Sequence, residues 1–145
     1  MEPQARQLCT FRVGDLFLGI DVRQVQEVLR HQKMTRVPLA TGAVRGLINL
    51  RGQIVTAIDL RARLGLPQRA DGSPPINVVV RGDDGVVTLL VDEIGDVRDV
   101  APDDFERPPE TLRGRSRELI IGAYKLVDRL LLLLDTVQSV RQQAD

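Results

Sequence analysis

Residues 46–64 align without a gap on residues 122–140, and this internal repeat constrains the fold more than any other feature of the chain. Each copy reads as a strand, a tight turn, an apolar strand, and an aspartate that can cap a short helix. A repeat present twice is too short for a solenoid and predicts two similar lobes that share one core. The positions identical in both copies are Gly46 and Gly122, Leu50 and Leu126, and Asp59 and Asp135.

A weaker repeat precedes each copy. Gly14-Asp15 and the Gly-Asp-Asp-Gly run at 82–85 each separate two apolar stretches, and Asp21 and Asp92 follow the second stretch in each case. Glycine accepts the positive φ that tight turns require, so both places are predicted to be hairpins. The two halves therefore share one plan of paired strands and capping aspartates.

The secondary structure expected from these patterns is mainly β. After Asp21, the spacing of Val22, Val25 and Val28 predicts an amphipathic helix, and further short helices are expected at 59–64 and at the C-terminus. The expected strands span 8–13, 16–20, 45–50, 53–58, 76–81, 86–91, 94–100, 119–125 and 129–134.

Proline and glycine divide the remaining chain. The segment 66–75 is rich in Pro, Gly and Ser and is the predicted linker, which gives approximate lobes at 14–66 and 76–140 within one domain of 145 residues. The prolines and arginines of 101–118 predict a long excursion whose arginines are either solvated or in contact with an anionic partner.

The composition excludes several classes of function. Hydrophobic residues make up 43% of the chain and aromatic residues only 3%, so the core must be aliphatic. A formal net charge of zero gives no general attraction to nucleic acid or to anionic membranes. One cysteine excludes an internal disulfide, the first residues do not resemble a signal peptide, and the apolar run 130–134 is too short to span a bilayer. A cytoplasmic protein without direct membrane insertion is expected.

No catalytic constellation can be assembled from the sequence. His31 is the only histidine and Cys9 reads as a small core residue. Neither a phosphate-binding glycine loop nor a pair of His or Cys residues at metal-ligand spacing is present. The pairs Asp83-Asp84 and Asp103-Asp104 are typical of turns and caps, and a metal-dependent hydrolase that uses them is the alternative from another class. We expect a binding module without catalytic residues, cofactor or metal.

Four stretches, taken in order, resemble the CheW-like coupling proteins of bacterial chemotaxis. They are F-R-V-G-D-L-F-L-G-I-D-V-R-Q-V-Q-E-V (11–28), V-R-G-L-I-N-L-R-G-Q-I-V-T-A-I-D-L-R (44–61), L-L-V-D-E-I-G-D-V (89–97) and D-R-L-L-L-L-L-D (128–135). The resemblance covers roughly 8–141 and is most specific at G-L-I-N-L-R-G-Q-I. One departure is Thr56, where many relatives have proline.

The resemblance implies two small five-stranded, SH3-like β-barrels related by approximate two-fold symmetry, with short helices and a C-terminal helix. It implies a non-enzymatic adaptor that joins the cytoplasmic signalling tip of chemoreceptors to the regulatory domain of a CheA-type histidine kinase. Recruitment to membrane receptor arrays and weak self-association in them are part of this expectation. A paralogue that serves surface motility or gene expression is the alternative within the same fold.

The resemblance also suggests site residues. Receptor binding is expected at six positions, and kinase coupling at Arg51, Gly52 and Glu27. The spacing of the aliphatic members also suits a core, and Gly46 is better explained by close backbone approach than by contact with a partner. Arg51 is either a solvated turn residue or the partner of Glu27, which we expect to lie near this turn. The six receptor positions are Val25, Glu27, Gly46, Asn49, Ile94 and Val97.

Overall fold

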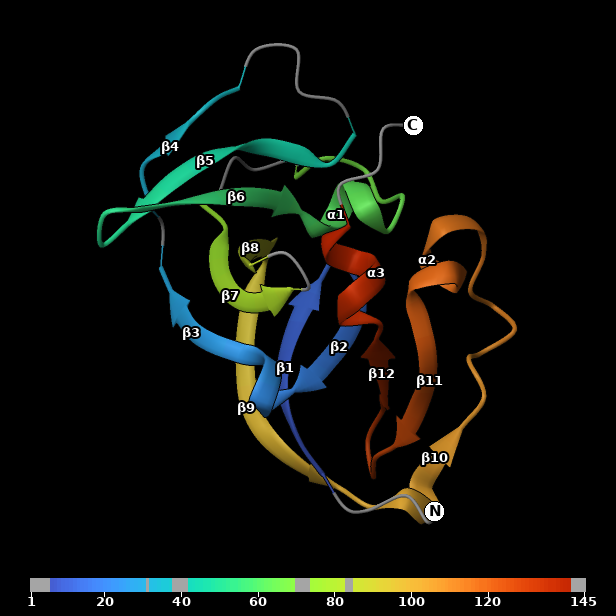
Figure 1. The fold of residues 1–145 in the computed structure, drawn as a ribbon. Coiled ribbons are helices and arrows are strands. Elements are labelled where there is room, and N and C mark those ends of the chain that lie inside the picture. Colours follow the sequence, from blue (N-terminus) through green and yellow to red (C-terminus); the bar gives the residue numbers. More distant parts are fainter. Residues whose placement is uncertain (1–5, 31, 38–41, 70–73, 83–84, 142–145) are drawn as a thin grey trace.

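The computed structural model describes residues 6–30, 32–37, 42–69, 74–82 and 85–141, which form two sheets of six strands each (Figure 1). The strands are β1 (Arg6–Val13), β2 (Leu16–Asp21), β3 (Val25–Leu29), β4 (Met34–Thr35), β5 (Val44–Leu50), β6 (Gln53–Asp59), β7 (Ile76–Gly82), β8 (Gly85–Val91), β9 (Glu93–Val100), β10 (Phe105–Glu106), β11 (Ile120–Lys125) and β12 (Leu130–Leu134). The helices are η1 (Val22–Gln24), α1 (Leu60–Arg63), η2 (Pro102–Asp104), α2 (Gly114–Leu119) and α3 (Thr136–Val140).

The two sheets have the same plan. One sheet runs β10-β11-β12-β2-β1-β9, and the other, read from its matching edge, runs β4-β5-β6-β8-β7-β3. Each contains a single parallel pair at its centre, β12 with β2 and β6 with β8, and the remaining pairs are antiparallel. The repeat in the sequence is thus an approximate two-fold symmetry of the fold. The sheets have six strands rather than the expected five because a two-residue strand, β4 or β10, pairs at one edge.

Sheet membership differs from the predicted lobes 14–66 and 76–140. The hairpin β1–β2 belongs to the sheet of β9–β12, and the hairpin β7–β8 belongs to the sheet of β3–β6. Each half of the chain therefore lends its first hairpin to the other half. The exchange gives the apolar strands β6 and β12 a hydrogen-bonded neighbour on both sides, which neither half supplies from its own strands.

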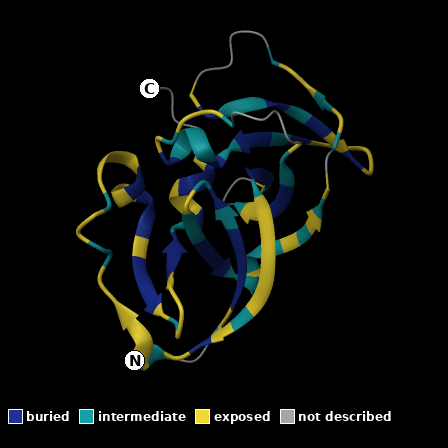
Figure 2. Cartoon of the chain, turned by 180° about the vertical axis from the view of Figure 1, so that it is seen from behind, coloured by how far each residue is buried: buried dark blue, intermediate teal, exposed yellow. Residues whose placement is uncertain are grey.

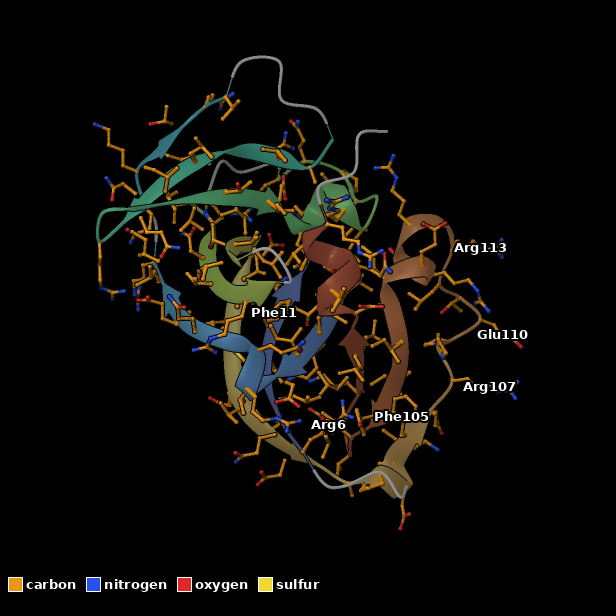
Figure 3. The ribbon with its side chains drawn as sticks, in the orientation of Figure 1. Arg6, Phe11, Phe105, Arg107, Glu110 and Arg113 are labelled. Carbon is orange, nitrogen blue, oxygen red and sulfur yellow. The ribbon has the colours of Figure 1, made fainter. Side chains whose placement is uncertain are left out.

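Among the described residues, one mostly aliphatic cluster connects the sheets, as the repeat predicts. Phe11, Ile58, Leu89 and Leu132 belong to it and come from four strands of the two sheets. Phe11 is completely buried and lies in the middle of the molecule (Figure 3). Cys9 is also buried in this cluster, and burial raises the pKa of its thiol, in agreement with its predicted place in the core. The core joins both sheets into one packed unit.

The prediction of an amphipathic helix after Asp21 is wrong. Asp21 does cap a turn of 3-10 helix, η1, but the chain then continues as the strand β3. Val25 pairs with Val80 and Val28 with Val78 of β7. A helix this short is marginal by itself, and β-branched side chains favour a pleated surface, so pairing with β7 determines the structure.

The remaining predicted elements agree with the structure to within two residues at each boundary, and Asp59 and Asp135 cap α1 and α3. The excursion after β9 contains η2, β10 and α2, and the labelled side chains of Arg107, Glu110 and Arg113 point away from the ribbon (Figure 3). Among the described helices, none is long and apolar enough to cross a membrane.

The polar residues considered for chemistry do not come together in the part of the chain that the structure describes. Asp103 and Asp104 lie in η2, and no group of three or more His, Cys, Asp and Glu side chains suited to a metal ion occurs among the described residues. His31 and the pair Asp83-Asp84 lie outside the described residues.

Candidate functional site: a polar turn and two sheet edges

The turn between β5 and β6 is shaped by its own sequence. Arg51 has a φ of 53° and Gly52 a φ of 87°, so both residues adopt the left-handed conformation. The side-chain carbonyl of Asn49 accepts a hydrogen bond of 2.8 Å from the backbone N–H of Gly52. A left-handed arginine is unusual, and the Asn49 bond helps to hold it in this conformation. Asn49 is exposed, and its amide oxygen supports the turn.

The turn directs Arg51 toward β3. Its guanidinium donates two hydrogen bonds to the carboxylate of Glu27, with N–O distances of 2.5 and 2.7 Å. This bidentate pair confirms that the two side chains lie together, although Glu27 is on a strand and not on the expected helix. The hydrogen bond from Arg51 lowers the pKa of Glu27, and the charge of Arg51 acts in the same direction. The side chain of Arg51 keeps 70% of its surface exposed, so the pair is accessible to a partner.

The matching place in the other sheet has no such pair. The repeat places Val127 where Arg51 stands in the first copy. Val127 is fully exposed and uncharged, so this turn, whose sequence is Leu-Val-Asp-Arg, has no arginine at the position of Arg51. The Arg51–Glu27 pair therefore distinguishes the two otherwise similar ends of the molecule.

Gly46 has a structural role. A Cβ atom built on Gly46 would overlap the carbonyl oxygen of Thr35 and lie 2.8 Å from Cγ of Met34, both in the edge strand β4. Gly122 occupies the equivalent position in the other sheet. A Cβ atom built on Gly122 would lie 2.6 Å from the carbonyl oxygen of Glu106 in β10. Close backbone approach explains both glycines, and for Gly46 it was predicted from the sequence.

The aliphatic candidates separate into two groups. Ile94 and Val97 on β9 are 39% and 57% exposed, so both are surface residues. Val25 on β3 is half-buried and packs against the main core cluster. Both strands are sheet edges, and β9 is exposed along most of its length (Figure 2). An exposed edge strand with aliphatic side chains can bind another polypeptide by strand pairing or side-chain contact.

A further polar cluster was missed by the sequence analysis. Asp92 accepts hydrogen bonds from the backbone of Gly14 at 2.7 Å and from Arg61 at 2.8 and 3.1 Å, and Arg69 donates to it at 2.6 Å. Burial opposes ionisation of this carboxyl, yet the hydrogen bonds from Arg61 and Gly14 and the charges of both arginines lower its pKa. The cluster attaches the linker residue Arg69 to the end of β8. The sequence signal was the placement of Asp92 directly after a buried strand.

These features define a class: a two-sheet β protein whose accessible polar turn and edge strands suit the binding of other proteins. The CheW-like domain family matches residues 7–144. The chain is 30% identical over 133 residues to the chemotaxis protein CheW of Treponema pallidum, which covers 89% of this chain and 78% of the relative. It is 33% identical over 129 residues to CheW of Bacillus subtilis, covering 89% and 83%.

A solved structure agrees with this likeness. The scaffolding protein TtCheW from Thermoanaerobacter tengcongensis superposes with a TM-score of 0.80 at 25% identity, over 91% of this chain and 90% of that one. The chain belongs to the CheW-like family. It is an adaptor of chemotaxis signal transduction that couples receptors to a CheA-type kinase, and its family is one of scaffolds without catalytic activity.

Proposed function

We propose that this chain is a non-enzymatic cytoplasmic adaptor with two docking surfaces that share Glu27, one for the signalling tip of a chemoreceptor and one for the regulatory domain of a CheA-type histidine kinase. The Arg51–Glu27 pair is the observation that carries the proposal. A bidentate, exposed ion pair held by a left-handed turn supports recognition better than it supports folding, because exposed pairs contribute little to stability.

The kinase surface consists of Arg51, Glu27 and Gly52. Arg51 and Glu27 fix the position of the turn relative to β3, and Gly52 supplies the N–H that Asn49 holds. Loss of the pair would free the turn while leaving the core unchanged. Electrostatic complementarity of this kind determines the orientation and choice of partner more than raw affinity.

The receptor surface consists of the exposed side chains of β9, Ile94 and Val97, with Val25 and Glu27 of β3 at its border. The exposure of Ile94 and Val97 supports their role as contacts. Gly46 contributes indirectly, because it allows β4 to lie against β5. Asn49 contributes through the turn. We further propose recruitment of the chain to membrane receptor arrays and weak self-association there.

Binding assays with isolated partners test the division into two surfaces. The Ile94→Ser and Val97→Ser variants are expected to lose affinity for a receptor signalling-tip fragment while binding the kinase regulatory domain normally. The Arg51→Glu variant is expected to do the reverse. Truncation of an interface anchor costs about 1–4 kcal/mol of binding, or about 5- to 1,000-fold in Kd. A wild-type chain that binds neither partner would reject the proposed function.

A further inference from the structure

A hollow of about 490 Å³ opens beside the first turn of α3, and none of the residues assigned above to receptor and kinase lines it. Its lining includes Asp21 and Arg23 at the end of β2 and in η1, Ile121 on β11, and Thr136 and Val137 of α3. Ile121 is 50% exposed and Val137 is 36% exposed. Two aliphatic side chains beside an arginine thus line an accessible depression.

The two-fold symmetry identifies the corresponding place in the other sheet. Leu132 of β12 lies opposite Leu18 of β2, and Thr56 of β6 lies opposite Val87 of β8. Because Thr56 and Leu132 match in the repeat, Leu18 corresponds to Val87. Five positions after Leu18 and Val87 are Arg23 and Asp92, which therefore also correspond. The resulting pairs around the hollow are Arg23 with Asp92, Val137 with Arg61, and Ile121 with Arg45.

In the other sheet, the linker of the chain itself covers this place. Arg61 donates to Asp92 and also, at 2.8 Å, to the carbonyl oxygen of Pro67. Arg69 then donates to Asp92 at 2.6 Å, and Leu66 packs against the main core cluster. Where the residue at the centre of this surface is an aspartate, the surface therefore binds a segment in which a leucine, Leu66, is followed closely by a basic residue, Arg69.

The charge is inverted at one position of the hollow, whose lining also includes Arg6 and the carboxylates of Asp21 and Asp135. Arg23 stands where the other sheet has Asp92, and Val137 and Ile121 stand where it has Arg61 and Arg45. Arg23 already donates two hydrogen bonds to the carboxylate of Asp21, at 2.7 and 3.0 Å, but 84% of its side chain is exposed, so a second carboxylate can reach the remaining N–H groups of its guanidinium. An acidic side chain is the complement of Arg23, and an aliphatic side chain is the complement of Ile121 and Val137.

We propose that this hollow is a third docking site, which binds an extended segment of a partner protein that presents an aliphatic side chain followed by an acidic one. The aliphatic side chain packs on Ile121 and Val137, and the carboxylate pairs with Arg23. The segment lies across the start of α3 as residues 66–69 lie across α1. Recognition of an extended peptide by one apolar contact and one charge-assisted pair is a common mode of partner binding.

Short peptides based on the linker sequence test this site directly. The probe is acetyl-Gly-Leu-Pro-Gln-Glu-amide, which copies residues 65–69 with glutamate in place of the arginine, and the control peptide retains the arginine. Each is titrated into isotope-labelled protein and followed by two-dimensional NMR. The glutamate peptide is expected to produce saturable shifts at Arg23, Ile121 and Val137, and to bind at least about tenfold more tightly than the arginine peptide.

A charge-swapped variant provides the decisive comparison. Arg23→Asp combined with Val137→Arg rebuilds the arrangement of Asp92 and Arg61, and it should reverse the preference so that the arginine peptide binds more tightly. Ile121→Ser alone should weaken binding of the glutamate peptide, whereas Val127→Ser, at an exposed valine in the β11–β12 turn, should leave it unchanged. Melting curves confirm that each variant folds. Absence of saturable shifts at these residues, equal binding of the two peptides, or an unchanged preference in the swapped variant would overturn the proposal.

Discussion

Replacing Gly46 by alanine tests the packing that underlies the site. The added methyl group would overlap the carbonyl oxygen of Thr35 and approach Cγ of Met34 to 2.8 Å. The side chain of Met34 can move, but Thr35 presents backbone, so β4 itself must shift away from β5. We expect the variant to fold with β4 displaced.

The expected loss of stability follows from the size of this overlap. Inserting a methyl group into a tightly packed place typically destabilises a protein by about 1–3 kcal/mol. For a domain of about 150 residues, each kcal/mol lowers Tm by roughly 2–4 °C, so the expected decrease is roughly 2–12 °C. Because β4 pairs through two residues only, most of the fold should remain intact.

Urea and thermal unfolding of the purified variant measure this effect. Gly122→Ala is the symmetry-related variant and should behave alike, because its methyl group would meet Phe105 and Glu106 of β10. Ile54→Ala, at a residue that is 60% exposed in the same hairpin, serves as the control and should stay within about 0.5 kcal/mol of the wild type. A Gly46→Ala variant as stable as this control would refute the close approach of β4.

Further predictions concern the polar groups and the edge strand. Arg51→Glu should abolish coupling of kinase to receptor with near-normal melting, and adding Glu27→Arg should restore part of the coupling through a reversed pair; no restoration would argue against the pair as the functional unit. Asp92→Asn should destabilise the protein most near neutral pH. Because the pKa of Asp92 is lowered in the fold, its contribution is complete above its ordinary value of 3.8 and is lost as the pH falls below it, so urea unfolding of variant and wild type should converge in acid. A constant difference at all pH values would contradict this assignment. Ile94→Ser and Val97→Ser should weaken receptor binding without lowering Tm by more than a few degrees, and the opposite pattern would return both residues to the core.

Much of the fold was predictable because strand, turn and cap signals coincide. In β5 and β6, the apolar alternation, the turn glycine and the capping Asp59 all indicate the same structure, and the repeat confirms it in β11 and β12. The prediction of a helix after Asp21 was wrong because valines at helical spacing also suit a strand. Only the pairing with β7 decides between the two structures. The exchange of hairpins between halves was not predictable, since parallel pairing of β6 with β8 leaves no local signal.

One contact of the candidate site could be predicted from the sequence. Arg51, at a glycine turn, was expected to pair with Glu27, and the two side chains do form this pair. Exposure of Ile94 and Val97 could not be read from their spacing, because a surface strand and a core strand share the same period. The Asp92 cluster depends on Arg61 and Arg69 reaching one carboxylate from separate elements, which only the folded structure reveals.

Reconstitution of the signalling complex tests the central claim most directly. Receptor signalling fragments, the cognate CheA-type kinase and this chain are combined, and kinase autophosphorylation and co-sedimentation with the receptor fragments are measured together. We predict that the wild-type chain is required both for receptor control of the kinase and for co-sedimentation of the kinase with the receptor fragments. The Arg51→Glu variant is expected to support neither. Kinase that is recruited and controlled equally well without the chain would contradict the account.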